Sequence, residues 1–155
     1  MARQPNWFCT PLPIIKFLQI VCALVVILFF MDGRQQWSPY TLIFLIAVIT
    51  VVVNVVLLAL HYFDVVRTNN AVPWLSVELA WNSILALSYL IAFGILTYDW
   101  WEIRGNRWSH HSATPPRNIG AAGWVNRVLC VAVASLINTV LALMLVQRLR
   151  IHKLA

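Results

Sequence analysis

Glu78 is a carboxylate inside a long apolar segment of this chain, and Asn82 follows it by about one helical turn. Residues with this spacing lie on the same face of a helix, so the two side chains are expected to point the same way. A charge near the middle of a membrane costs about 2.5–3.5 kcal/mol on insertion scales, so such residues normally face a partner inside a bundle. The pair therefore predicts a face directed at neighbouring helices and away from lipid.

Catalytic or metal chemistry finds little support in the other reactive residues. His110 and His111 are adjacent, so on a regular helix or strand their side chains point apart and make a poor pair of ligands. Metal sites also need a third or fourth ligand, and we interpret the nearest acids, Asp99 and Glu102, as free surface residues together with the histidines. Ser109 and His110 lack a carboxylate placed by spacing to orient the imidazole. We expect no enzymatic activity, no metal and no cofactor.

The composition is typical of a protein that lies almost entirely in a membrane. Of the 155 residues, 61% are hydrophobic and 10% are charged, and the mean hydropathy is +0.79. A soluble domain has about 25% charged residues. The formal net charge of +6 reflects scarce acids, and no Lys and Arg cluster forms the basic face that nucleic-acid binding requires. The expected partner is the lipid bilayer, and no nucleic acid is expected.

Four apolar segments are each long enough to cross a bilayer, which takes about 20 residues. They predict an all-α integral membrane fold, a four-helix transmembrane bundle that forms one domain over residues 1–155. No small-residue cleavage site follows the first segment, so we interpret it as a retained span and not as a signal peptide. The spans are expected at residues 12–31, 40–62, 74–97 and 124–147.

The charges near the ends of the spans favour an orientation with both the N and C termini in the cytoplasm. Positive residues close to span ends are enriched on the cytoplasmic side. Lys16 and the tail residues Arg148, Arg150 and Lys153 meet that condition. The basic tail can also rest on anionic lipid.

Each predicted span carries one amide side chain at a similar depth. At about 1.5 Å per residue, counted from the cytoplasmic ends, the four amides lie about 10–14 Å into the membrane, and Lys16 and Glu78 lie about 6 Å deep. We predict a polar layer in the cytoplasmic half of the bundle; the alternative is a set of unrelated polar residues, each bonded to backbone. Interhelical hydrogen bonds average about 0.6 kcal/mol, so the layer would specify packing more than add stability. Its members are Lys16, Gln19, Asn54, Glu78, Asn82 and Asn138.

His61 and the longest loop are expected at the membrane surface. His61 lies at the end of the second span and is most simply an interface histidine. The longest loop, residues 98–123, is dense in Trp, as expected of a belt at the lipid interface. Pro115, Pro116 and Gly120 are expected to break any regular element in this loop.

The cysteines indicate no extracellular disulfide framework, because Cys22 and Cys130 lie in spans and Cys9 lies in the N-terminal segment. Cys9 is just outside the first span, where a thiol is a candidate for S-palmitoylation. The alternative is an unmodified thiol.

Two segments resemble those of a known family. Leu12-Pro13-Ile14-Ile15-Lys16-Phe17-Leu18-Gln19-Ile20-Val21 is similar to the first helix of MARVEL-domain proteins, the group that contains MAL, the physins, gyrins and occludin. Val77-Glu78-Leu79-Ala80-Trp81-Asn82, continuing to Leu90-Ile91-Ala92-Phe93, resembles the third helix of that group. The chain lacks the loop cysteines of the physins, which favours a compact, MAL-like member.

The resemblance implies a non-enzymatic scaffold that acts in membrane apposition, vesicle trafficking, lipid microdomains or cell junctions. Its partners would be the bilayer, including sterol-rich membrane, and other membrane proteins or further copies of the chain. Its location would be the plasma membrane or secretory and endosomal vesicles. The alternative is a subunit of a channel or transporter that uses the polar layer around Glu78 as a polar path.

Overall fold

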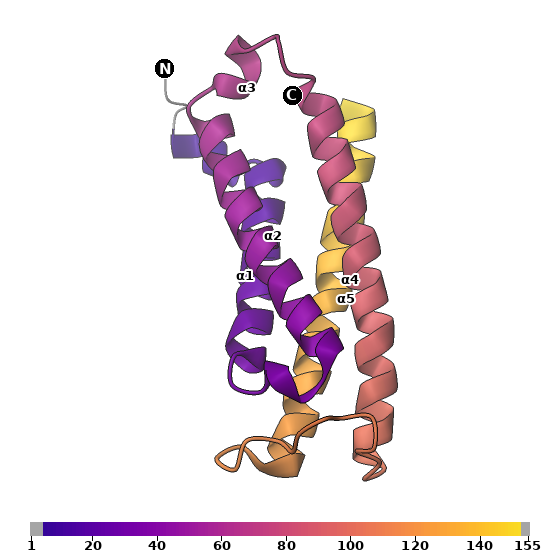
Figure 1. Ribbon diagram of the computed structural model, residues 1–155. Helices are drawn as coiled ribbons and strands as arrows, with labels where there is room; N and C mark the ends of the chain where they lie inside the picture. Colours follow the sequence, from indigo (N-terminus) through magenta and orange to yellow (C-terminus); the bar gives the residue numbers. More distant parts are fainter. Residues whose placement is uncertain (1–4, 153–155) are drawn as a thin grey trace.

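The computed structural model describes residues 5–152, and this part of the chain is helical with short connections (Figure 1). Four helices are long and apolar enough to cross a membrane by length and composition, which indicates a multi-pass membrane protein. Three short elements lie between or before them. The long helices are α1 (Pro11–Phe30), α2 (Ser38–Tyr62), α4 (Trp74–Arg104) and α5 (Gly120–His152); the short ones are η1 (Pro5–Cys9), η2 (Arg34–Gln36) and α3 (Val65–Thr68).

Proline and glycine set most helix ends. Prolines occupy the first turns of α1 and α2, where a missing N–H leaves no hydrogen bond unmade. Pro73 precedes α4, and Gly105 follows its last residue. The left-handed backbone of Gly120, with φ of 73°, opens α5, a conformation that glycine adopts without steric cost.

The third and fourth long helices extend beyond the predicted spans. α4 continues past residue 97 to Arg104, and α5 runs from Gly120 to His152 instead of from 124 to 147. The prediction that Gly120 breaks regular structure is wrong, because a helix begins there. The loop itself is therefore shorter than residues 98–123. At about 1.5 Å per residue, both helices exceed the bilayer core of about 30 Å.

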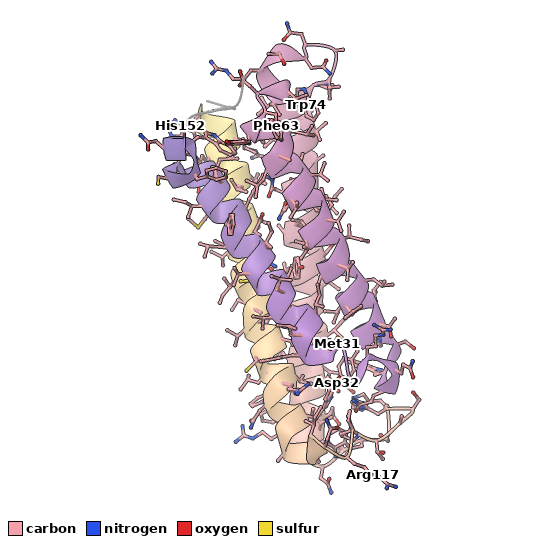
Figure 2. All side chains as sticks on the ribbon, turned by 90° about the vertical axis from the view of Figure 1, so that its left-hand side faces the viewer. Met31, Asp32, Phe63, Trp74, Arg117 and His152 are labelled. Carbon is pink, nitrogen blue, oxygen red and sulfur yellow. The ribbon has the colours of Figure 1, made fainter. Side chains whose placement is uncertain are left out.

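The four long helices pack in the order α2, α1, α5, α4. α1 contacts both α2 and α5, and α4 packs along α5 over much of its length, whereas the backbones of α2 and α4 come close at few positions. Phe63, Trp74 and His152 lie at one end of the bundle and Met31, Asp32 and Arg117 at the other (Figure 2). The first and last described residues therefore lie at the same end (Figure 1).

The surface of the bundle is apolar on every long helix. Leu28, Leu42, Leu87 and Leu143, one from each helix, are all more than half exposed. Phe30, Leu96, Trp124 and Val128 are buried in one apolar cluster, in the half of the bundle that ends at Met31, Asp32 and Arg117, which we call the loop end. Apolar residues that face outward suit a hydrocarbon environment, because lipid chains are as apolar as the side chains.

Gly33→Ala is expected to lower the free energy of unfolding by about 1–3 kcal/mol, because overpacking forces side chains out of favourable rotamers. A Cβ at Gly33 would lie well inside van der Waals contact with the Gln36 amide and the Trp124 ring. The matched control is Gly94→Ala, where a Cβ meets nothing within 4 Å; it should leave stability unchanged or raise it by up to about 1 kcal/mol. Denaturant unfolding in mixed micelles measures both, and equal effects would contradict this packing.

Candidate functional site

A buried ion pair joins α1 to α4 near the end of the bundle that holds Phe63, Trp74 and His152. Lys16 Nζ lies 2.8 Å from Glu78 Oε2, and neither side chain is more than 1% exposed. The second carboxylate oxygen, Oε1, lies 3.0 Å from His61 Nε2 on α2. Asn82 Nδ2 donates to Oε2 at 3.2 Å and to the backbone carbonyl of Glu78 at 2.8 Å. Each oxygen of this buried carboxylate therefore has a partner, as burial of charge requires.

Amide side chains continue the ion pair into the bundle. Gln19 is central: its Nε2 donates to Asn82 Oδ1 at 3.3 Å, and its Oε1 accepts from Asn54 Nδ2 at 3.0 Å. Asn138 Nδ2 donates to the backbone carbonyl of Gln19 at 3.4 Å. Trp81 Nε1 donates to Asn54 Oδ1 at 3.0 Å. We call this set the ion-pair network: Lys16, Gln19, Asn54, His61, Glu78, Trp81, Asn82 and Asn138.

The structure brings together all six residues expected in the polar layer and adds two that the sequence analysis did not place there. His61 is 2% exposed and bonds to Glu78, so the interpretation as an interface histidine is wrong. Its spacing from Asn54 by about two helical turns was the available signal, because such residues share a helix face. Trp81 lies next to Asn82 and reaches Asn54 from the edge of the same interface.

A second polar cluster lies at the opposite end of the bundle, around Asp99 on α4. Asp99 Oδ1 lies 2.7 Å from His110 Nε2 and 2.8 Å from His111 Nε2. The Tyr40 hydroxyl of α2 donates to Asp99 Oδ2, and Trp124 Nε1 of α5 donates to the Tyr40 oxygen at 3.2 Å. We call these five residues the Asp99 cluster. They tie three helices and the long loop together.

The interpretation of Asp99, His110 and His111 as free surface residues is wrong. Asp99 is fully buried, and the two imidazoles converge on one of its oxygens because both histidines lie in a turn, which His111 N–H closes by donating to the Trp108 carbonyl at 3.0 Å. Because neither histidine lies in a regular helix or strand, their being adjacent in the sequence does not force the two side chains to point apart. Glu102 does lie at the surface, where it pairs with Arg107 at 2.8 Å.

An apolar layer separates the two polar groups. Thr50 and Tyr89 form the last polar contact on the ion-pair side, with Tyr89 Oη donating to Thr50 Oγ1 at 3.0 Å. Four buried residues lie between this contact and the Asp99 cluster, and they pack in one apolar cluster: Ile43, Ala47, Ala92 and Leu96. Across the described part of the chain, the polar groups therefore make no continuous path from end to end.

The cysteines take no part in either cluster. Cys9 is exposed in η1, just before α1 begins, and Cys22 and Cys130 are free thiols. Along α5, Ala134, Asn138 and Ala142 follow Cys130 at intervals of four residues and are buried, whereas Cys130 is exposed.

The fold and the two clusters define an all-helical protein with four membrane-length helices and a polar interior. Comparison with known protein families, known proteins and solved structures gave no match.

Proposed function

We propose that this protein is a non-enzymatic four-span membrane scaffold with both termini in the cytoplasm. It organises membrane through its outer surface, in membrane apposition, vesicle trafficking, lipid microdomains or cell junctions. The resemblance to compact MARVEL-domain proteins favours this assignment, and the plasma membrane or secretory and endosomal vesicles are the expected location.

The division between a paired polar interior and an apolar exterior carries the proposal. The Glu78 carboxylate is occupied by Lys16, His61 and Asn82 and is closed off from lipid. The surface available to other molecules inside the bilayer is the row of exposed apolar side chains on each helix. Such a surface suits contact with lipid, with other membrane proteins or with a second copy of the chain.

Cys9 offers a thiol for attachment of a lipid. It is exposed beside Phe8, which is 44% exposed. A juxtamembrane thiol in this position is the kind that is S-palmitoylated, and an acyl chain there would favour ordered, sterol-rich membrane.

The scaffold is tested with the purified chain in giant vesicles whose lipids separate into sterol-rich and sterol-poor phases, combined with proximity labelling in cells. We expect enrichment in the sterol-rich phase when Cys9 is palmitoylated, and a reproducible set of membrane-protein neighbours. Cys9→Ser is the control for the contribution of the lipid. The scaffold function would be contradicted if the palmitoylated chain divided equally between the two lipid phases and proximity labelling gave no reproducible set of neighbours.

A channel or transporter subunit is the second candidate, because the ion-pair network places charge inside a span. The apolar layer formed by Ile43, Ala47, Ala92 and Leu96 closes a single bundle, so conduction would need an oligomer. Conductance in planar bilayers that changes with Glu78→Ala would favour this candidate over the scaffold.

A further inference from the structure

We propose that Asp99, His110 and His111 bind a divalent transition-metal ion, with Zn²⁺ the best match, at the loop end of the bundle. The proposal is independent of the scaffold function. It reverses the expectation from sequence that these residues hold no metal.

The three side chains already converge on one point. One ligand atom from each, the two imidazole nitrogens and a carboxylate oxygen, lie within 4.8 Å of one another. In a tetrahedral zinc site with bonds of about 2.0–2.1 Å, neighbouring ligand atoms are about 3.3 Å apart. The present separations of 2.7 and 2.8 Å from Asp99 Oδ1 therefore need to open by only about half an ångström.

The surroundings hold these ligands in position. The Trp37 ring stacks on His111 with centroids 5.8 Å apart and meets His110 edge-on at 5.1 Å. Ser112, the next residue, donates its N–H to the Gln36 carbonyl at 2.8 Å, which fastens the loop to η2. The Tyr40 hydroxyl bonds to the other oxygen of Asp99. Such a partner orients a coordinating carboxylate, as outer-shell groups do in metal sites.

The ligand set selects the ion. Imidazole nitrogens favour zinc and other late first-row metals, whereas Mg²⁺ and Ca²⁺ prefer oxygen ligands. Three protein ligands leave one position of a tetrahedral ion for water. An ion can enter from the aqueous side, because the His110 side chain is 20% exposed while Asp99 and His111 are buried.

Metal binding would fasten the long loop to the end of α4. Asp99 lies in the last two turns of α4, and both histidines lie in the loop that leads to α5. A bound ion would therefore stabilise the loop against the bundle, and the unfolding temperature should rise with metal concentration.

The test uses the full chain in nanodiscs after removal of metal with a chelator. The chain is titrated with Co²⁺ while visible absorption is recorded, and one Co²⁺ ion should bind per chain. Zn²⁺ added afterwards should displace the Co²⁺. His110→Ala should weaken binding by more than about 100-fold, beyond the loss typical of an outer-shell change. The matched control His152→Ala removes an exposed histidine from the end of α5 and should bind like the parent chain.

His110→Ala is the decisive variant because its side chain is the least buried of the three. X-ray absorption of the Zn²⁺-loaded parent chain gives a result that needs no variant, and it should show two imidazole ligands. Absence of binding at millimolar metal, equal binding by His110→Ala, or a zinc spectrum without two imidazoles would each overturn the proposal.

Discussion

Glu78→Gln is expected to lower the free energy of unfolding by about 3–5 kcal/mol, the range found when one partner of a buried ion pair is removed. The change leaves the Lys16 ammonium group in the interior, and Glu78 is the acidic residue that it contacts in the described chain. Lys16→Met should cost less, because Glu78 keeps His61 and Asn82 as partners. The loss of stability is therefore expected to be larger for Glu78→Gln than for Lys16→Met.

The double variant Lys16→Met/Glu78→Gln should be more stable than the sum of the single changes predicts, since neither charge is then left alone. Folded yield in detergent and unfolding in mixed micelles measure all three variants. Simple additivity would show that the two side chains do not interact. The surface pair of Glu102 and Arg107, also 2.8 Å apart but with side chains 21% and 56% exposed, is the matched control. Glu102→Gln should cost at most about 1 kcal/mol.

Trp124→Ala is the second substitution with a large expected effect, a loss of about 3–5 kcal/mol in the free energy of unfolding. The Trp124 side chain is completely buried, and its ring centroid lies 5.8 Å from that of Phe30 and 5.6 Å from that of Tyr40. Its indole N–H also donates to the Tyr40 hydroxyl that supports Asp99. The substitution thus creates a cavity and removes one support of the Asp99 cluster.

Trp101→Ala is the control, because Trp101 is 63% exposed. It removes the same side-chain volume from a position on the outside of α4, so it should change stability by less than about 1 kcal/mol. Thermal unfolding followed by circular dichroism compares the two variants. A loss at Trp101 as large as that at Trp124 would show that Trp124 does not occupy the core.

Hydropathy was sufficient to predict the four long helices, because apolar length is what a span requires. It failed at the ends of α4 and α5. Charged and aromatic residues continue α4 beyond its apolar segment, whereas α5 is extended by glycine and alanine at its start and by basic residues at its end. The signal in α4 was Gly105, the first helix-ending residue after Thr97, together with the shared face of Leu96, Asp99 and Ile103, all of which are buried.

The ion-pair network could be anticipated by counting depth along the helices, since nearly straight helices place residues at predictable heights. Lys16 and Glu78, which were predicted at the same depth, form an ion pair, and Gln19 bonds to Asn82, which was also predicted at its depth. The Asp99 cluster could not be anticipated in this way. Its two histidines come from a turn without regular periodicity, so only the folded loop shows that both reach one carboxylate oxygen.

The polar contacts that join α1 and α2 to α4 have a consequence for biosynthesis. Gln19 and its partner Asn82 are 63 residues apart in the sequence, and synthesis at about 5–20 residues per second separates their appearance by about 3–13 s. During that interval α1 and α2 carry Lys16, Gln19 and Asn54, while α4, which supplies partners for all three, has not yet been made. We therefore expect a nascent chain halted before α4 emerges to be degraded faster than a chain halted after α4, because α4 carries the groups that complete this bonding.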